Sequence, residues 1–298
     1  MTAQQITQVL QFPKVTTHYG VEMWLKEKCM PDKGEVQGPR VLYHEPENFS
    51  RTHHFDFSRW HDLEEVTFGW GNVRIQTQVQ DLVGLPNLRK LSISGESTLG
   101  ISEDKSGLLN TLRLLTTLKS LQIPNWYRRE DAELPPEYEE FHSLPGYLPL
   151  LEEFGPVFVV SGVFNETVQR NRAAYNRIRY VSAATNHREI GTFWSNLNDA
   201  FPNVRSVSAT VEGFEDMWKD SDKRRRLRAG MREAVKALKS LVVRTPQRVR
   251  MICIRVRTGF DSPKKFTSWL QEAIRGSVRA ELGLKCTQQY EIYVDEDC

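Results

Sequence analysis

Three histidines are the side chains in this sequence that come closest to forming a metal or catalytic cluster. His53 and His54 are adjacent, and His61 follows a short distance along the chain. A structural zinc site needs four converging ligands, usually supplied as two close pairs, and the cysteines lie too far apart in sequence to form such pairs. Adjacent side chains of an extended segment point to opposite faces, which explains His53 and His54 more simply. We therefore expect no metal site.

An acid–base pair is the second chemistry that the sequence could support. His61 lies near Glu64 and Glu65, but these residues also fit the start of a strand with exposed neighbours. The chain contains no serine-hydrolase elbow, phosphate-binding loop, zinc-protease helix or dinucleotide fingerprint. The glycines of segment 69–72 fit a turn, which lacks the downstream lysine of a phosphate site. We therefore expect no catalytic residues and no cofactor.

A run of basic residues is the strongest charged motif. It consists of Lys223, Arg224, Arg225, Arg226 and Arg228. Such a run binds phosphates or acts as a nuclear import signal, and the alternative is a solvated helix face. Aspartates between positions 216 and 222 neutralise part of it, toward the start of the expected helix, where the helix dipole favours acids. The formal net charge of the chain is only +2, which disfavours nucleic acid as a partner.

The composition is that of an ordinary globular protein, with 298 residues, of which 39% are hydrophobic and 26% are charged. No apolar run reaches the roughly 18 residues of a transmembrane helix, so we expect no membrane partner. The segment Met1–Val15 has neither the basic start nor the apolar core of a secretory signal. We therefore expect reduced cysteines and a cytoplasmic or nuclear location.

An internal repeat is the main signal in the sequence. The segments Leu85–Ser94 and Phe201–Thr210 share Pro, Asn, Arg and Ser at four equivalent positions. Weaker copies keep the same spacing: an apolar residue, two others, a second apolar residue, two others, and then alternation. The second apolar residue, called the anchor below, recurs at intervals of 25 to 33 residues. The anchors are Leu63, Leu88, Leu118, Leu151, Ile178 and Val204.

The elements that must position these residues are short strands alternating with helices. The last part of each copy alternates apolar and polar residues, which predicts a strand with one buried face. Between the copies, apolar residues at helical spacing predict helices, the longest being a basic helix around 214–241. In the segment Arg248–Arg257, arginines occupy even-numbered positions at first and odd-numbered positions later, so they cannot all face one side of a regular strand. This change predicts a bulge or a register change in a further strand. Strands and helices alternating at so short a period stack into a solenoid.

Over Phe55 to Val294 the chain resembles the irregular members of the leucine-rich-repeat family, most clearly in Leu85–Ser94 and Leu115–Ile123. The resemblance implies an α/β solenoid with parallel strands on the concave face and helices or loops on the convex face. The asparagine ladder of regular repeats is absent after the strands. The equivalent positions are occupied by Gly71, Glu96 and Glu212.

The repeats are also similar to the recognition halves of fungal F-box-type proteins. That likeness implies a non-catalytic module that binds another protein, as in substrate recognition for a ubiquitin ligase, with a ligase adaptor as a further partner. No F-box-like helical module is visible in Met1–Gly38, which is short and polar. The alternative function is a nuclear or nucleic-acid-binding module that uses the basic run at 223–228.

The expected organisation is an N-terminal cap over residues 1–54, followed by the solenoid over residues 55–298. A cap covers the apolar surface that the end of a solenoid otherwise exposes. An acidic insertion at 125–144 contains six acidic residues and the pair Pro135 and Pro136. We expect this insertion to form a surface loop.

In a solenoid the partner binds along the strand face, on side chains that point away from the core. The register of Leu88, Leu91 and Ile93 predicts which residues these are, and the alternative is that the face is merely solvated. They are Glu65, Thr67, Lys90, Ser92, Ser120, Gln122, Tyr180, Ser182, Ser206 and Ser208. Tyr180 is the expected anchor for a partner, because aromatic side chains dominate interface energetics.

Overall fold

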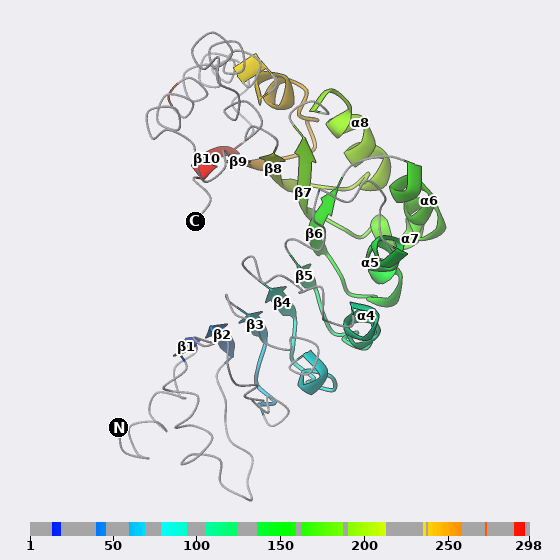
Figure 1. Cartoon of the computed structure of the whole chain (residues 1–298), viewed down its shortest axis with the longest axis vertical. Helices are drawn as coiled ribbons and strands as arrows, with labels where there is room; N and C mark the ends of the chain where they lie inside the picture. Colours follow the sequence, from blue (N-terminus) through cyan, green and yellow to red (C-terminus); the bar gives the residue numbers. More distant parts are fainter. Residues whose placement is uncertain are drawn as a thin grey trace, which may run out of the picture. The chain divides into compact units, whose positions relative to one another are not determined.

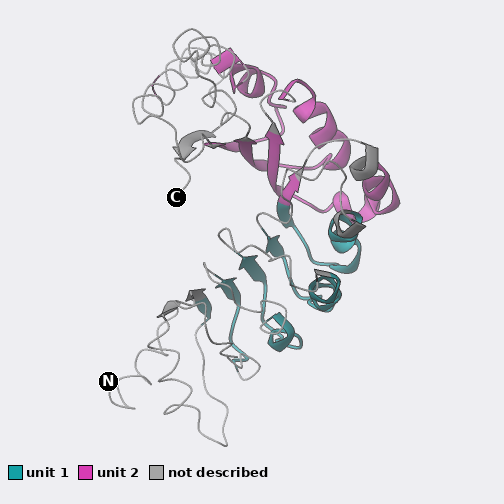
Figure 2. Cartoon of the chain, in the orientation of Figure 1, with its two compact units in different colours: residues 1–155 teal, residues 156–298 magenta. Residues whose placement is uncertain are grey.

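The computed structural model describes residues 14–18, 40–45, 60–68, 79–93, 105–123, 136–158, 162–186, 190–212, 235–236, 238–257, 272 and 289–295. The chain forms two compact units, Met1–Gly155 and Pro156–Cys298 (Figure 2). The basic run at 223–228 and the histidines His53 and His54 lie outside the described residues.

The first unit is built on parallel strands that pair in the order in which they follow along the chain (Figure 1). Every described pair, from β1 with β2 to β5 with β6, has parallel register. The strands are β1 (Lys14–His18), β2 (Val41–Glu45), β3 (Glu65–Phe68), β4 (Lys90–Ile93), β5 (Ser120–Gln122) and the start of β6 (Glu153–Phe158). Strands β1 and β2 fall within the segment expected to form a cap, and they extend this sheet.

Helices connect the strands of the first unit. Residues 79–81 are helical, and α4 (Lys105–Arg113) and α5 (Pro136–Tyr147) follow. The expectation of a surface loop is wrong for the second half of the acidic insertion, because Phe141 and Leu144 of α5 are fully buried. Two apolar residues at helical spacing suffice to bury one face of a helix, although acidic residues surround them in sequence.

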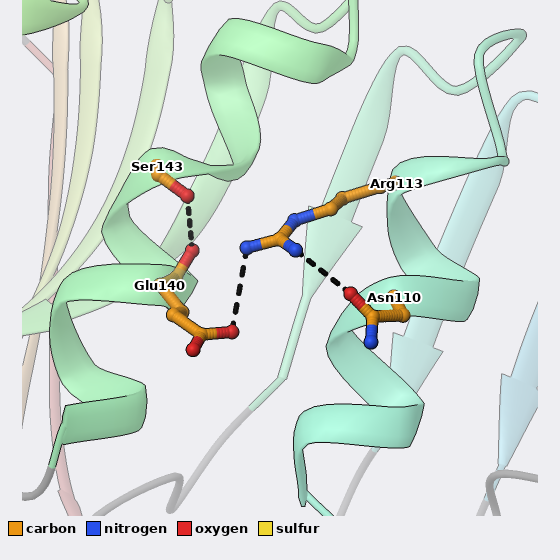
Figure 3. Close-up of polar contacts among 4 residues, drawn as sticks. All are labelled: Asn110, Arg113, Glu140 and Ser143. Atoms are coloured by element: carbon orange, nitrogen blue, oxygen red, sulfur yellow. Dashed lines mark hydrogen bonds and ion pairs between the residues drawn. The ribbon is translucent and has the colours of Figure 1, made fainter.

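Arg113 joins the end of α4 to α5 (Figure 3). Its Nη1 donates to Asn110 Oδ1 at 2.8 Å, and its Nη2 lies 3.3 Å from Glu140 Oε2. Its guanidinium carbon lies 4.9 Å from the centre of the Tyr147 ring, which is a cation–π distance. The helices of two adjacent repeats are thus joined by a half-buried polar contact in addition to apolar packing.

The second unit repeats this construction. Its strands pair in sequence order and are parallel in all three described pairs. They are β7 (Tyr180–Asn186), β8 (Ser206–Glu212), β9 (Met251–Arg257) and β10 (Gln289–Asp295). The helices are α6 (Gly162–Arg170), α7 (Arg172–Tyr175) and α8 (Ile190–Ala200), and residues 238–243 are also helical. Among the described helices, none has the length and apolarity needed to cross a membrane.

The apolar residues of the repeat form the core of each unit. Leu88, Leu91 and Ile93 are fully buried, and the three equivalent apolar residues of the copy Val204–Ala209 are buried in the same way. The polar residue between the last two apolar residues of these copies remains half-buried. The prediction of an α/β, leucine-rich-repeat-like solenoid with parallel strands is therefore confirmed.

Backbone hydrogen bonds connect the start of six strands, β3 to β6, β8 and β9, to the preceding repeat. The carbonyl oxygen of the residue after an anchor accepts amides from two consecutive residues of the next repeat. Arg89 accepts from Lys119 at 2.7 Å and from Ser120 at 3.0 Å. This pair of hydrogen bonds to one carbonyl oxygen fixes the register before the strand begins. The side chains of neighbouring strands therefore alternate between core and solvent in step.

The parity change in Arg248–Arg257 has the same cause. Val249 and Ile252 are buried, with the exposed Arg250 and Met251 between them. The amides of Arg250 and Met251 both donate to the carbonyl oxygen of Arg205, at 2.7 and 3.3 Å. The expected register change is therefore the ordinary step from an anchor to its strand, and Val249 is the anchor of a further copy of the repeat.

Candidate functional site

The outward face of the first unit carries two rows of side chains in register. The first row contains Glu65, Lys90, Ser120 and Glu153, and the second contains Thr67, Ser92 and Gln122, followed by Gly155. Between these rows lie the fully buried Val66, Leu91 and Leu121. Neighbouring strands lie about 4.8 Å apart, so a ligand on this face can contact several members of a row. All six outward residues predicted for this unit lie in these two rows.

Ser120 occupies its predicted place in the row, but its side chain is covered. The residue is 6% exposed, and its Oγ has no hydrogen-bond partner among the described residues. Gln122 donates from its side-chain amide to Glu153 Oε1 on the adjacent strand. Glu153 was not predicted from the sequence, although it stands two residues after the anchor Leu151, as Lys90 does after Leu88.

Two outward rows of the second unit contain the predicted residues. The first contains Tyr180, Ser206 and Met251, and the second contains Ser182, Ser208 and Cys253. Tyr180 is 45% exposed and Met251 is 38% exposed. All four outward residues predicted for this unit lie in these rows. Met251 and Cys253 were missed because Val249 was not recognised as an anchor, although Val249, Ile252 and Ile254 have the spacing of the repeat.

In the second unit, a further row lies one residue before the first outward row, and this row is basic. It contains Arg179, Arg205 and Arg250, called the arginine column below. The carbonyl oxygen of Arg179 accepts from the amide of Arg205 at 2.8 Å, and that of Arg205 accepts from Arg250 at 2.7 Å. These backbone bonds hold the three residues on neighbouring strands. Arg205 and Arg250 are exposed, and Arg179 is half-buried.

The equivalent row of the first unit has mixed charge. It contains Arg40, Glu64, Arg89, Lys119 and Glu152. Arg40 Nη2 lies 2.6 Å from Glu64 Oε1 in an ion pair, so these two neighbours of the row neutralise each other. In contrast, no carboxylate pairs with Arg205 or Arg250 within the part of the chain that the structure describes.

The two units carry opposite formal charges. Residues 1–155 contain 15 Lys and Arg against 22 Asp and Glu, a balance of −7. Residues 156–298 contain 25 Lys and Arg against 16 Asp and Glu, a balance of +9. The near-neutral total of +2 therefore hides a strongly basic unit, whose field attracts anions.

The other titratable groups form no reactive centre among the residues described. The Glu64 carboxylate is held by Arg40, and no group of three His, Cys, Asp or Glu side chains that could hold a metal ion occurs in the described ranges. His142 on α5 is fully buried, with ring centres 5.4 Å from Phe141 and 6.4 Å from Phe154. Burial lowers the pKa of His142 from 6.5 to about 3, so this histidine is a neutral core residue.

Comparison with known proteins adds little to this description. No protein-family model and no curated protein sequence matches the chain. Among solved structures, the chain is similar to one in the crystal structure of the TLR13–ssRNA13 complex, with 11% identity and a TM-score of 0.27. The similarity covers 80% of this chain and 37% of that chain. The fold assignment depends on the strand order and register described above, and not on this likeness.

Proposed function

We propose that the chain is a non-catalytic interaction module that binds another protein through the outward sheet faces of its units. The observation that carries this proposal is the register of the outward rows. In the second unit, for example, Ser182, Ser208 and Cys253 stand on neighbouring strands at equivalent positions. The strands beneath them are anchored by fully buried side chains, so the rows form a preorganised surface.

The chemistry of these rows suits a protein partner. Serine, threonine and glutamine side chains offer donors and acceptors without obstructing close approach. Tyr180 and Met251 add partly exposed apolar area at the margin of the second unit's rows. Interfaces combine a few such anchors with surrounding polar contacts. Nothing in the described rows combines a nucleophile with an activating base.

As the setting for this binding we propose substrate recognition in an F-box-type ubiquitin ligase, in the cytoplasm or nucleus. The support is the resemblance of the repeats to the recognition halves of such proteins. A ligase adaptor would then be the second partner. Its contact would use residues outside the outward rows, since the rows would hold the substrate.

The test is affinity purification of the tagged full chain with quantitative mass spectrometry of the retained proteins. Two variants, Ser92→Arg and Ser208→Arg, each place a bulky charge in an outward row while leaving the core unchanged. Thr116→Arg, in an exposed turn after α4, is the matched control. We expect a client protein that the wild type and Thr116→Arg retain and that at least one row variant loses. Retention that is equal in all four proteins would contradict the proposal.

The second candidate function is nucleic-acid binding through the basic run at 223–228, which lies outside the described residues. The positive balance of the second unit favours this candidate. Its test is the binding of a labelled oligonucleotide at increasing salt concentration. A steep loss of affinity, reduced when the run is changed to glutamine, would support it.

A further inference from the structure

We infer that the protein partner presents an acidic segment with apolar side chains, and that this segment docks on the arginine column and on Tyr180 and Met251 beside it. This inference rests on the proposed function and specifies the chemistry of the partner. The docking surface lies entirely within the second unit. Below it is called the arginine strip.

The geometry of the arginine column suits an acidic segment. Its three members precede strands β7, β8 and β9 at the same position of the repeat, one residue after the anchors Ile178, Val204 and Val249. The backbone bonds between them are 2.8 and 2.7 Å long, which holds their Cα atoms near the spacing of parallel strands, about 4.8 Å. Carboxylates on successive turns of a bound helix lie about 5 to 6 Å apart. A single acidic segment can therefore reach more than one of these arginines.

The charges of the arginine column also favour an acidic partner. Like charges directly opposite on neighbouring strands destabilise a sheet, and the arginine column places one positive charge at the start of each of three neighbouring strands. At equivalent positions of the first unit, Arg40 and Glu64 carry opposite charges and form an ion pair. Neither Arg205 nor Arg250 has a carboxylate partner among the described residues. Carboxylates from another molecule would neutralise the column, and guanidinium groups bind them in bidentate geometry.

The outward row beside the arginine column supplies apolar contact area. Tyr180, Ser206 and Met251 directly follow the three arginines, and the tyrosine and methionine are partly exposed. Apolar contact area next to cationic groups fits a peptide that carries both acidic and apolar side chains. Proteins bind single-stranded nucleic acid by stacking successive bases on aromatic side chains. The described part of this strip contains one aromatic residue. The positive balance of the whole unit would steer an acidic segment toward the strip.

The test is fluorescence anisotropy with the full chain and three labelled probes. The first probe is a short, capped peptide of glutamates that flank a phenylalanine and a leucine. The second probe is its glutamine analogue, and the third is an oligo-dT strand of similar length. The variants are Tyr180→Ala and the double variant Arg205→Gln with Arg250→Gln. The control variant is Arg172→Gln, an exposed arginine of α7 outside the strip.

We expect the glutamate peptide to bind more tightly than its glutamine analogue. The double variant should weaken that binding about tenfold, Tyr180→Ala should also weaken it, and Arg172→Gln should leave it nearly unchanged. The inference is overturned if the glutamate peptide does not bind to folded protein, or if Arg172→Gln weakens it as much as the double variant. Tighter binding of oligo-dT through the same arginines would overturn it in favour of nucleic acid.

The same variants separate this inference from the proposed function. If the double variant still retains the client that Ser208→Arg loses, the outward rows bind a protein and the arginine strip does not contribute. In that case the proposed function stands and the inference fails. If no row variant changes the retained proteins but the peptide result holds, the strip is a binding site and the tested serine positions of the outward rows do not contribute.

Discussion

The side-chain amide of Asn203 donates to the backbone carbonyl oxygen of Asn176 at 2.9 Å, and Asn87 makes the equivalent bond to His61 at 3.0 Å. Each donor lies one residue before an anchor, and each acceptor lies two residues before the anchor of the preceding repeat. Asparagines therefore do bridge neighbouring repeats in this protein. They act before the strands, whereas the regular family pattern places them after the strands.

Replacing Asn87 or Asn203 with alanine should lower the free energy of unfolding by about 1 kcal/mol each. Each change removes one bridging bond, but the exposed acceptor can be rehydrated, which limits the loss. Urea denaturation would measure the effect. Thr116→Ala, in an exposed turn, is the control and should change stability by less than about 0.5 kcal/mol. An equal loss in all three variants would show that the bridges add nothing.

Leu91→Asp should prevent folding, because Leu91 is fully buried and its replacement would leave a carboxylate without a partner. Ser92→Asp, one residue further along β4, should leave folding nearly intact because that side chain lies in an outward row. Circular dichroism and thermal unfolding of both variants would compare the two faces of one strand. A cooperatively folded Leu91→Asp protein would refute the register described here.

Ser120→Ala should be neutral or slightly stabilising. The Ser120 hydroxyl is buried without a hydrogen-bond partner among the described residues, so its removal deletes a desolvated polar group and no bond. Ser92→Ala, at a half-buried outward position, is the matched comparison. A marked loss of stability in Ser120→Ala alone, measured by urea denaturation, would mean that the hydroxyl is bonded in solution.

His142→Phe should make stability less dependent on pH. The unfolded chain binds a proton on this histidine below about pH 6.5, whereas the folded chain does not do so until about pH 3. The unfolded state therefore binds more protons, and the free energy of unfolding falls as pH decreases from about 6.5, by up to about 1.4 kcal/mol per pH unit. Denaturation midpoints near pH 7.5 and near pH 5 should differ less in the variant. Equal differences in both proteins would mean that His142 is protonated in the fold.

Trp194→Phe should lower the free energy of unfolding by about 1 to 2 kcal/mol. Trp194 Nε1 on α8 donates to the buried carbonyl oxygen of Leu241 at 2.6 Å, and the Thr245 hydroxyl donates to the same oxygen at 3.1 Å. Because the two donors share one acceptor, adding Thr245→Val should cost more in the Trp194→Phe background than in the wild type. Strictly additive losses in chemical denaturation would show that the two bonds are independent.

Much of the fold could be predicted because each copy of the repeat joins an anchor at a fixed spacing to a strand of alternating apolar and polar residues. An anchor followed by an alternating strand places Leu88, Leu91 and Ile93 in the core, and the residues between them must then face outward. The outward rows follow from the same alternation, and all ten predicted members lie in them. The weak copies were the exceptions. The anchor Val249 and the outward Glu153 were missed, although both stand at the spacing of the repeat from buried apolar residues.

Net charge predicted the binding surface less well than the apolar pattern predicted the core. A total of +2 argued against any strong field, but the total averages over units of opposite charge. The boundary near residue 155 became known only from packing, and the change in charge balance across it is seen once the two units are counted separately. The arginine column has the same origin, since Arg179, Arg205 and Arg250 are far apart in sequence and become neighbours only through strand pairing.

The sequence by itself therefore determined the solenoid class and, for the strands whose anchors were recognised, the side that faces solvent, because alternating apolar residues must be buried together. Only the tertiary structure decided which outward residues stand side by side, that Ser120 is covered and that arginines without a carboxylate partner among the described residues line one margin of the second unit. These features depend on pairing between distant segments and on neighbouring side chains, which a local pattern does not contain.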